Sequence, residues 1–234
     1  MKWNVDTAGA CLVLCACTLL ASCAQTPAPP REAADDVATV SYDITYSIAI
    51  DDGEFARAGI RVEQESRRLR ELRFSIDPER FRDFAGDGEV IESDGQVTWR
   101  PPRRGGTLTF AVRVSNQRAS GAYDARLTER WGLFRGGDIF PPAATKTVVG
   151  AESVARLEFD LPDGWSALTP YLSGDSDLSF PISNPERRFD RPTGWILVGD
   201  IGVRRGSIGD TRVAIGAPVG EGVHRMDLMA YLRW

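Results

Sequence analysis

Histidine is almost missing from this chain of 234 residues, which contains His224 and no other. A zinc site with two histidines and a relay of several histidines therefore cannot be built within it. The motif His-Glu-x-x-His is also absent, because Leu228 stands four positions after His224. We therefore expect no catalytic residues, no metal site and no cofactor, and we expect that the chain is not an enzyme.

Other signatures of chemistry are missing as well. The sequence has no Gly-x-Ser-x-Gly nucleophile motif, no phosphate-binding loop that ends in Gly-Lys-Ser or Gly-Lys-Thr, and no dinucleotide fingerprint. Its 28 basic and 33 acidic residues give a net charge of −5. Nucleic acid is therefore not an expected partner, because affinity for it depends on neutralising phosphates.

The chain also lacks a hydrophobic run long enough to span a bilayer. Its longest uncharged apolar stretch, Ala8–Leu20, is too short for a membrane helix but has the length of a signal-peptide core. Cys11, Cys15 and Cys17 lie inside that stretch, so Cys23 is the one cysteine left after cleavage. The folded part then has no thiol pair that could form a disulfide or chelate a metal.

The end of this stretch, Leu20-Ala21-Ser22-Cys23, resembles the lipobox of bacterial lipoproteins. The resemblance implies that residues 1–22 are a lipoprotein signal peptide and that Cys23 is the lipidation site. Several acyl chains would anchor the mature chain stably to a membrane. We expect the bacterial cell envelope as its location, as an outer-membrane lipoprotein facing the periplasm, with ordinary secretory cleavage nearby as the alternative.

Residues 23–38 predict an extended tether, because Ala24–Asp36 contains three prolines and several charges but no large apolar side chain. Beyond it, large apolar residues alternate with small or polar ones from Val40 to Ile50, which predicts a strand with one buried face. Further short strands follow, each bounded by turn residues, and Ser93-Asp94-Gly95 indicates a hairpin. The fold class expected is mainly β, with an antiparallel β-sandwich-like domain over residues 39–165.

Local features inside and after this domain predict other elements. Pro78 opens an expected short helical turn in which Phe81 and Phe84 are three apart. Residues 166–222 predict a loop and β-hairpin region, in which Trp195–Val203 would pair with Thr211–Ile215. Residues 223–234 predict the start of a short C-terminal helix, which either begins a second domain absent from this chain or packs back on the sheet.

The segment from Trp131 to Pro142 is the preferred candidate for binding. Arg135-Gly-Gly-Asp138 predicts a flexible turn flanked by aromatic residues, and loops of this kind commonly carry recognition. The binding residues expected are Trp131, Arg135, Asp138 and Phe140. A rival interpretation is a sugar-stacking surface, although strand-end aromatics are more often packing residues. Its members would be Trp99, Trp131, Trp165 and Trp195.

Three segments carry a resemblance to a known family: VSYDITYSIAI at residues 40–50, the segment Trp131–Pro142, and LEFDLPDGW at Leu157–Trp165. With them the chain resembles the N-terminal, non-catalytic region of glycyl aminopeptidase-like zinc metallopeptidases, peptidase family sixty-one. The resemblance implies a β-rich domain ahead of a thermolysin-like catalytic domain, whose zinc is held by His-Glu-x-x-His and a further Glu. That motif is absent here, so no catalytic residue carries over.

Two functions follow as hypotheses. The first is a membrane-anchored periplasmic lipoprotein whose non-catalytic β domain acts as a scaffold or as the substrate-side wall for a separately encoded catalytic domain. The alternative is a free-standing β-sandwich lipoprotein that binds peptide or glycan.

Overall fold

The computed structural model describes residues 40–50, 54–174, 176–183 and 189–232. The expected signal peptide, the tether and Cys23 lie outside the described residues. Within these described residues there are two short helices, α1 (Gly136–Ile139) and α2 (Arg225–Tyr231). The strands are β1 (Val40–Ile50), β2 (Phe55–Glu63), β3 (Leu69–Ser75), β4 (Phe81–Gly86), β5 (Glu89–Ser93), β6 (Gln96–Arg100), β7 (Gly105–Arg113), β8 (Asn116–Gln117), β9 (Tyr123–Leu127), β10 (Trp131–Arg135), β11 (Ala143–Thr147), β12 (Ala151–Asp160), β13 (Ser166–Leu168), β14 (Ser179–Ile182), β15 (Trp195–Gly199), β16 (Ile201–Ile208) and β17 (Thr211–Pro218).

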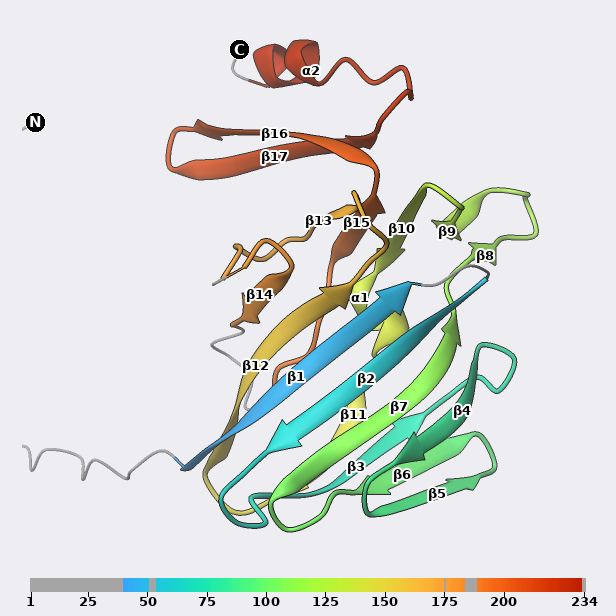
Figure 1. The fold of residues 1–234 in the computed structure, drawn as a ribbon, viewed down its shortest axis with the longest axis vertical. Coiled ribbons are helices and arrows are strands. Elements are labelled where there is room, and N and C mark those ends of the chain that lie inside the picture. Colours follow the sequence, from blue (N-terminus) through green and yellow to red (C-terminus); the bar gives the residue numbers. More distant parts are fainter. Residues whose placement is uncertain (1–39, 51–53, 175, 184–188, 233–234) are drawn as a thin grey trace, which may run out of the picture. The chain divides into compact units, whose positions relative to one another are not determined.

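The strands in the described part of the chain form four sheets, arranged as in Figure 1. The largest has the order β14-β12-β1-β2-β7-β4, the next β13-β15-β10-β9-β8, and the third β11-β3-β6-β5. The fourth is a two-stranded ribbon of β16 and β17. The fold is therefore mainly β and sandwich-like, with a short C-terminal helix, as the alternation predicted.

The core lies between the inner faces of the three larger sheets. Tyr42, Ile44, Tyr46 and Ile48 of β1 are each at most 1% exposed, so the predicted apolar face of this strand is buried. The four-stranded and five-stranded sheets contribute to the same cluster. Their buried side chains include Leu72, Phe74, Val97, Trp99, Phe134, Ile196 and Val198.

The hairpin predicted at Asp94-Gly95 joins β5 and β6 of the four-stranded sheet, with φ values of 49° and 72° at these two residues. In the largest sheet, β1 and β2 are antiparallel, in line with the antiparallel domain expected. β1, however, pairs with β12 in parallel, with Val40 opposite Ala151 and Ala49 opposite Asp160. Alternation reports which face of a strand is buried but not its direction, so the sequence did not reveal this parallel pair.

The prediction of a helical turn after Pro78 is wrong beyond the first residues of the segment. The Phe81 amide donates a hydrogen bond to the Asp77 carbonyl, but Phe81 then begins strand β4. Asp83 has a φ of 59°, and the register against β7 shifts between Arg82 and Ala85, which marks a β-bulge. Because a bulge changes the side-chain alternation, two phenylalanines three apart can reach the same side of a strand.

Both phenylalanines of β4 contact one ring of β7. The centroid of Phe110 lies 6.1 Å from that of Phe81 and 4.9 Å from that of Phe84. A spacing of three that is typical of a helix is here produced by a bulged strand.

The hairpin expected between Trp195 and Ile215 is also arranged differently. β15 ends at Gly199 and pairs with β10 and β13, and the hairpin partner of β17 is the separate strand β16. Gly199 has a φ of 129°, and a Cβ there would lie 2.4 Å from the Arg130 carbonyl oxygen. The chain therefore breaks at a position that tolerates only glycine.

Helix α2 follows the ribbon, as expected for the C-terminal segment, and Met229 is its buried residue. No helix within the described ranges has the length and apolar character needed to cross a bilayer.

Candidate binding site

The segment Trp131–Pro142 connects two sheets. It forms β10 of the five-stranded sheet, then α1, and continues into β11 of the four-stranded sheet. The glycine pair inside it is a helical turn held by a neighbouring loop, not a flexible turn. The Gly136 amide donates a 2.9 Å hydrogen bond to the Gly194 carbonyl, and a Cβ on Gly136 would lie 3.0 Å from Pro192.

Phe140 is a core residue, with 1% of its surface exposed. Its ring centroid lies 4.9 Å from that of Tyr46 and 6.2 Å from that of Phe110, both in edge-to-face geometry. Its carbonyl accepts a 2.9 Å hydrogen bond from Arg191. Phe140 therefore fixes the position of the segment and does not reach the surface, while Asp138 is half-buried in α1.

Trp131 and Arg135 lie on the outer face of β10, with the exposed Leu133 between them. The guanidinium carbon of Arg135 is 4.6 Å from the ring centroid of Trp195, its partner on β15. This distance is typical of a cation–π contact. The structure thus brings Trp131 and Arg135 to one face, buries Phe140 in the core and leaves Asp138 half-buried.

The four tryptophans of the rival interpretation do not form one surface. Trp99 has no exposed surface, and its Nε1 donates a 2.8 Å hydrogen bond to the Asp87 carbonyl. Trp131 and Trp165 are half-buried, whereas Trp195 is 47% exposed. Trp195 is therefore the tryptophan of this set that is best placed to contact a ligand.

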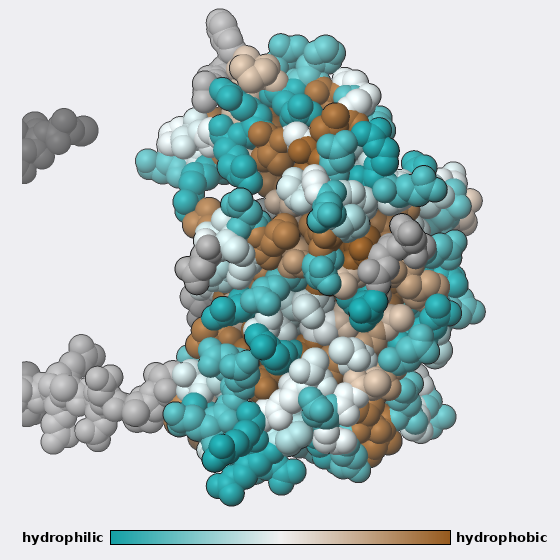
Figure 2. Space-filling view, in the orientation of Figure 1, coloured by the Kyte–Doolittle hydropathy of each residue, from teal (hydrophilic) through white to brown (hydrophobic). Residues whose placement is uncertain are grey.

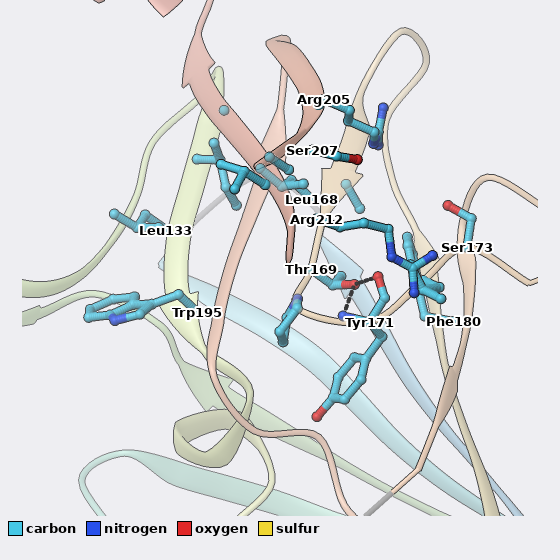
Figure 3. Close-up of a pocket in the computed structure, with 18 residues that line it drawn as sticks. Leu133, Leu168, Thr169, Tyr171, Ser173, Phe180, Trp195, Arg205, Ser207 and Arg212 are labelled. Atoms are coloured by element: carbon cyan, nitrogen blue, oxygen red, sulfur yellow. Dashed lines mark hydrogen bonds between the residues drawn. The ribbon is translucent and has the colours of Figure 1, made fainter. Parts of the chain in front are cut away.

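A cleft of about 1110 Å³ opens beside Trp195, between the five-stranded sheet and the β16–β17 ribbon. Figure 3 shows Leu133 and Trp195 at one side of it and Arg205, Ser207, Arg212 and Ser173 at the other. The loop after β13 supplies a rim in which Thr169 is hydrogen-bonded to Tyr171 in both directions. Figure 2 shows hydrophobic patches between hydrophilic surface in the upper as well as the lower part of the view.

The sequence alone does not predict this cleft. Its walls come from β10, β13, β14, β15, β16 and β17, strands that become neighbours only when the sheets assemble. The one signal in the sequence was Trp195 at a strand end, which by itself is more often a packing residue.

The cleft does not have the ligands of a metal site. Across the part of the chain that the structure describes, no group of three or more His, Cys, Asp or Glu side chains could hold a metal ion. His224 is exposed at the start of α2, where its Nδ1 lies 3.8 Å from the Asp227 carboxylate.

Comparisons with known proteins place the fold. Neither a protein-family model nor a curated protein sequence matches the chain. Among solved structures, an aminopeptidase N family protein from Idiomarina loihiensis is similar with a TM-score of 0.59 and 16% sequence identity. The similarity covers 81% of this chain but 35% of that protein, so the chain spans about a third of its length.

Two other solved structures are similar with lower TM-scores. An M1 zinc metallopeptidase from Deinococcus radiodurans has a TM-score of 0.43 at 15% sequence identity. The similarity covers 83% of this chain and 51% of that protein. The aminopeptidase A of Legionella pneumophila has a TM-score of 0.39 at 9% sequence identity. The similarity covers 80% of this chain and 25% of that protein.

In fold, this chain therefore resembles a part of an aminopeptidase N family protein, a part that makes up about a third of that protein's length. At this identity the likeness concerns the fold alone. Kinship with peptidase family sixty-one in particular stays a prediction.

Proposed function

We propose that this chain is the β domain of an aminopeptidase-like assembly at the bacterial cell envelope, anchored by lipid at Cys23. Its role is that of a scaffold or substrate-side wall for a catalytic domain encoded separately. The observation that carries this proposal is the fold similarity that covers 81% of this chain but 35% of an aminopeptidase N family protein.

The surface of α2 supports a packing role. Met226, Leu228 and Tyr231 on this helix and Leu232 directly after it are between 45% and 78% exposed. Exposed apolar side chains that gather on one element are typical of an interface, because monomeric proteins rarely leave such surface in water. A catalytic domain would cover them.

A reconstitution experiment tests this proposal. The reading frames at and beyond the codon for Trp234 are searched for His-Glu-x-x-His, and the encoded domain is expressed with the full chain. We expect the two to co-elute, with aminopeptidase activity in the complex and none in this chain alone. Tyr231→Asp should abolish co-elution, whereas Glu221→Ala, at an exposed site outside α2, should not.

Two results would contradict the proposal. One is a search that finds no reading frame with the zinc motif. The other is stoichiometric zinc together with peptide hydrolysis in the purified chain, because a single histidine would then have to support a metal centre.

The alternative is a free-standing binding module for peptide or glycan that uses the outer face of β10. The Arg135–Trp195 contact favours it, because that contact holds an exposed aromatic ring in place. In that case Trp131→Ala would weaken ligand binding while the fold stays intact. Phe140→Ala is not a usable test, because Phe140 is buried.

A further inference from the structure

The two walls of the cleft have different chemistry. Arg205 lies opposite Ala214 across the ribbon, and Ser207 lies opposite Arg212, so these side chains share one face. Gly216 belongs to the same face, and a Cβ there would lie 2.5 Å from Leu168 of β13. The face with both arginines is therefore the one turned toward β13 and β15.

The two arginines are placed to bind one anionic group. As diagonal neighbours across an antiparallel pair, Arg205 and Arg212 have Cβ atoms about 7 Å apart, within reach of two long side chains. Both are exposed, and neither forms an ion pair with a described residue. No Asp or Glu is found among the described residues that line the cleft, although acidic residues outnumber basic ones by 33 to 28 in the chain.

A carboxylate complements this local excess of positive charge. A guanidinium presents paired N–H donors that match the two oxygens of a carboxylate. A carboxylate held between Arg205 and Arg212 would pair with guanidinium groups that form no ion pair with a described residue.

The opposite wall is apolar and accessible. Leu133, Leu172 and Trp195 are 38%, 57% and 47% exposed, and Leu168 and Leu197 continue the surface beneath them. The volume of about 1110 Å³ is slightly above the range of about 300–1,000 Å³ usual for ligand pockets. The cleft can therefore take several amino-acid residues or an apolar chain of similar size.

The polar groups along the cleft favour a peptide over an apolar chain as the occupant. β13 and β14 each end a sheet, so each has an edge without a strand partner in the described part of the chain. Such edges bind extended peptides through backbone hydrogen bonds. The hydroxyls of Ser173 and Ser207 also form no hydrogen bond with any described residue. A peptide backbone can use these groups, whereas a hydrocarbon chain cannot.

We propose that this cleft binds the carboxyl-terminal end of an apolar peptide. Arg205 and Arg212 hold the terminal carboxylate, and the peptide's side chains lie on the wall that contains Leu133 and Trp195. The inference depends on the cleft alone and holds whether or not the chain assembles with a peptidase.

Calorimetric titration of the full chain tests it with acetyl-Leu-Leu-Phe as the probe. We expect the free acid to bind about tenfold more tightly, or more, than the same peptide as its carboxamide, because a charge-assisted pair is lost in the amide. Arg205→Gln and Arg212→Gln should each weaken binding of the acid about tenfold and leave the amide unchanged. Trp195→Ala should weaken acid and amide alike.

Arg204→Gln is the matched control, because Arg204 is exposed on the same strand but its side chain belongs to the other face of the ribbon. It should leave binding of the acid unchanged. Equal affinity for acid and amide would overturn the proposal, as would unchanged binding in Arg212→Gln or the absence of binding at millimolar peptide. Tighter binding of laurate than of the peptide would also overturn it, because the site would then be one for a fatty acid.

Discussion

The buried carboxylate of Glu71 offers a sharp test of what stabilises the four-stranded sheet. Its side chain is 5% exposed and contacts three cations: Lys146 at 2.7 Å, Arg100 at 2.9 Å and Arg73 at 3.0 Å. Lys146 lies on β11, Arg100 on β6 and Arg73 on β3. One carboxylate therefore connects three adjacent strands.

The charge state of Glu71 sets the size of the expected effect. Hydrogen bonds from Lys146 and then Arg100 lower the pKa of Glu71 from 4.5 to about 2. A shift of this size corresponds to at most about 3 kcal/mol of folding free energy. The three cations are 40% to 62% exposed and thus screened by water, so we expect about 2 kcal/mol from this group.

The sign of the pH dependence follows from the direction of the shift. The pKa of Glu71 is lower in the folded chain than in the unfolded chain, so its contribution is fully present above about pH 5. It is lost as the pH falls toward 2, because the folded state must then also bind the proton. Glu71→Gln should therefore lower the free energy of unfolding by about 2 kcal/mol at pH 7, and the difference from wild type should shrink between pH 5 and pH 2.

Urea denaturation of the full chain at pH 7, 5 and 3, followed by circular dichroism, measures this difference. Glu89→Gln is the matched control, because Glu89 is 55% exposed and contacts Arg100 at 2.7 Å. Its effect should stay within about 0.5 kcal/mol. A Glu71→Gln difference that does not change with pH, or one no larger than that of the control, would refute the reasoning.

Three further predictions concern the core, a tight backbone contact and the anchor. Phe140→Ala should lower the free energy of unfolding by about 3–5 kcal/mol, since a fully packed ring is removed; a loss below 1 kcal/mol in urea denaturation would contradict its place in the core. Gly105→Ala should be destabilising by more than about 2 kcal/mol, because its φ is 105° and the new Cβ would lie 1.9 Å from the Val62 carbonyl oxygen. Gly121→Ala, with a φ of 83° but nothing within 4 Å, should cost about 1 kcal/mol, and equal losses would exclude the contact as the cause. Cys23→Ser should abolish incorporation of labelled palmitate in a bacterial host, and persistent labelling would show that Cys23 is not the lipidation site.

The candidate site could be predicted only in part. The aromatic residues and glycines of Trp131–Pro142 single out this segment in the sequence. They do not show which of its side chains are exposed, because nothing in the sequence distinguishes a buried aromatic residue such as Phe140 from a half-buried one such as Trp131. Phe140 is buried by Tyr46 and Phe110, which come from strands far away along the chain. The cleft was missed for the same reason, since its arginines and its apolar wall belong to different sheets.

What the sequence alone determined is local. The alternation of buried and exposed residues in β1 and the turn at Asp94-Gly95 depend on side-chain direction and backbone sterics within a few residues. Both can therefore be predicted without a structure. Tertiary structure decided the parallel pairing of β1 with β12, the bulge at Asp83 and the grouping of Arg205 and Arg212 opposite Trp195. Each of these depends on which distant strands become neighbours, and that choice is made by the packing of the whole core.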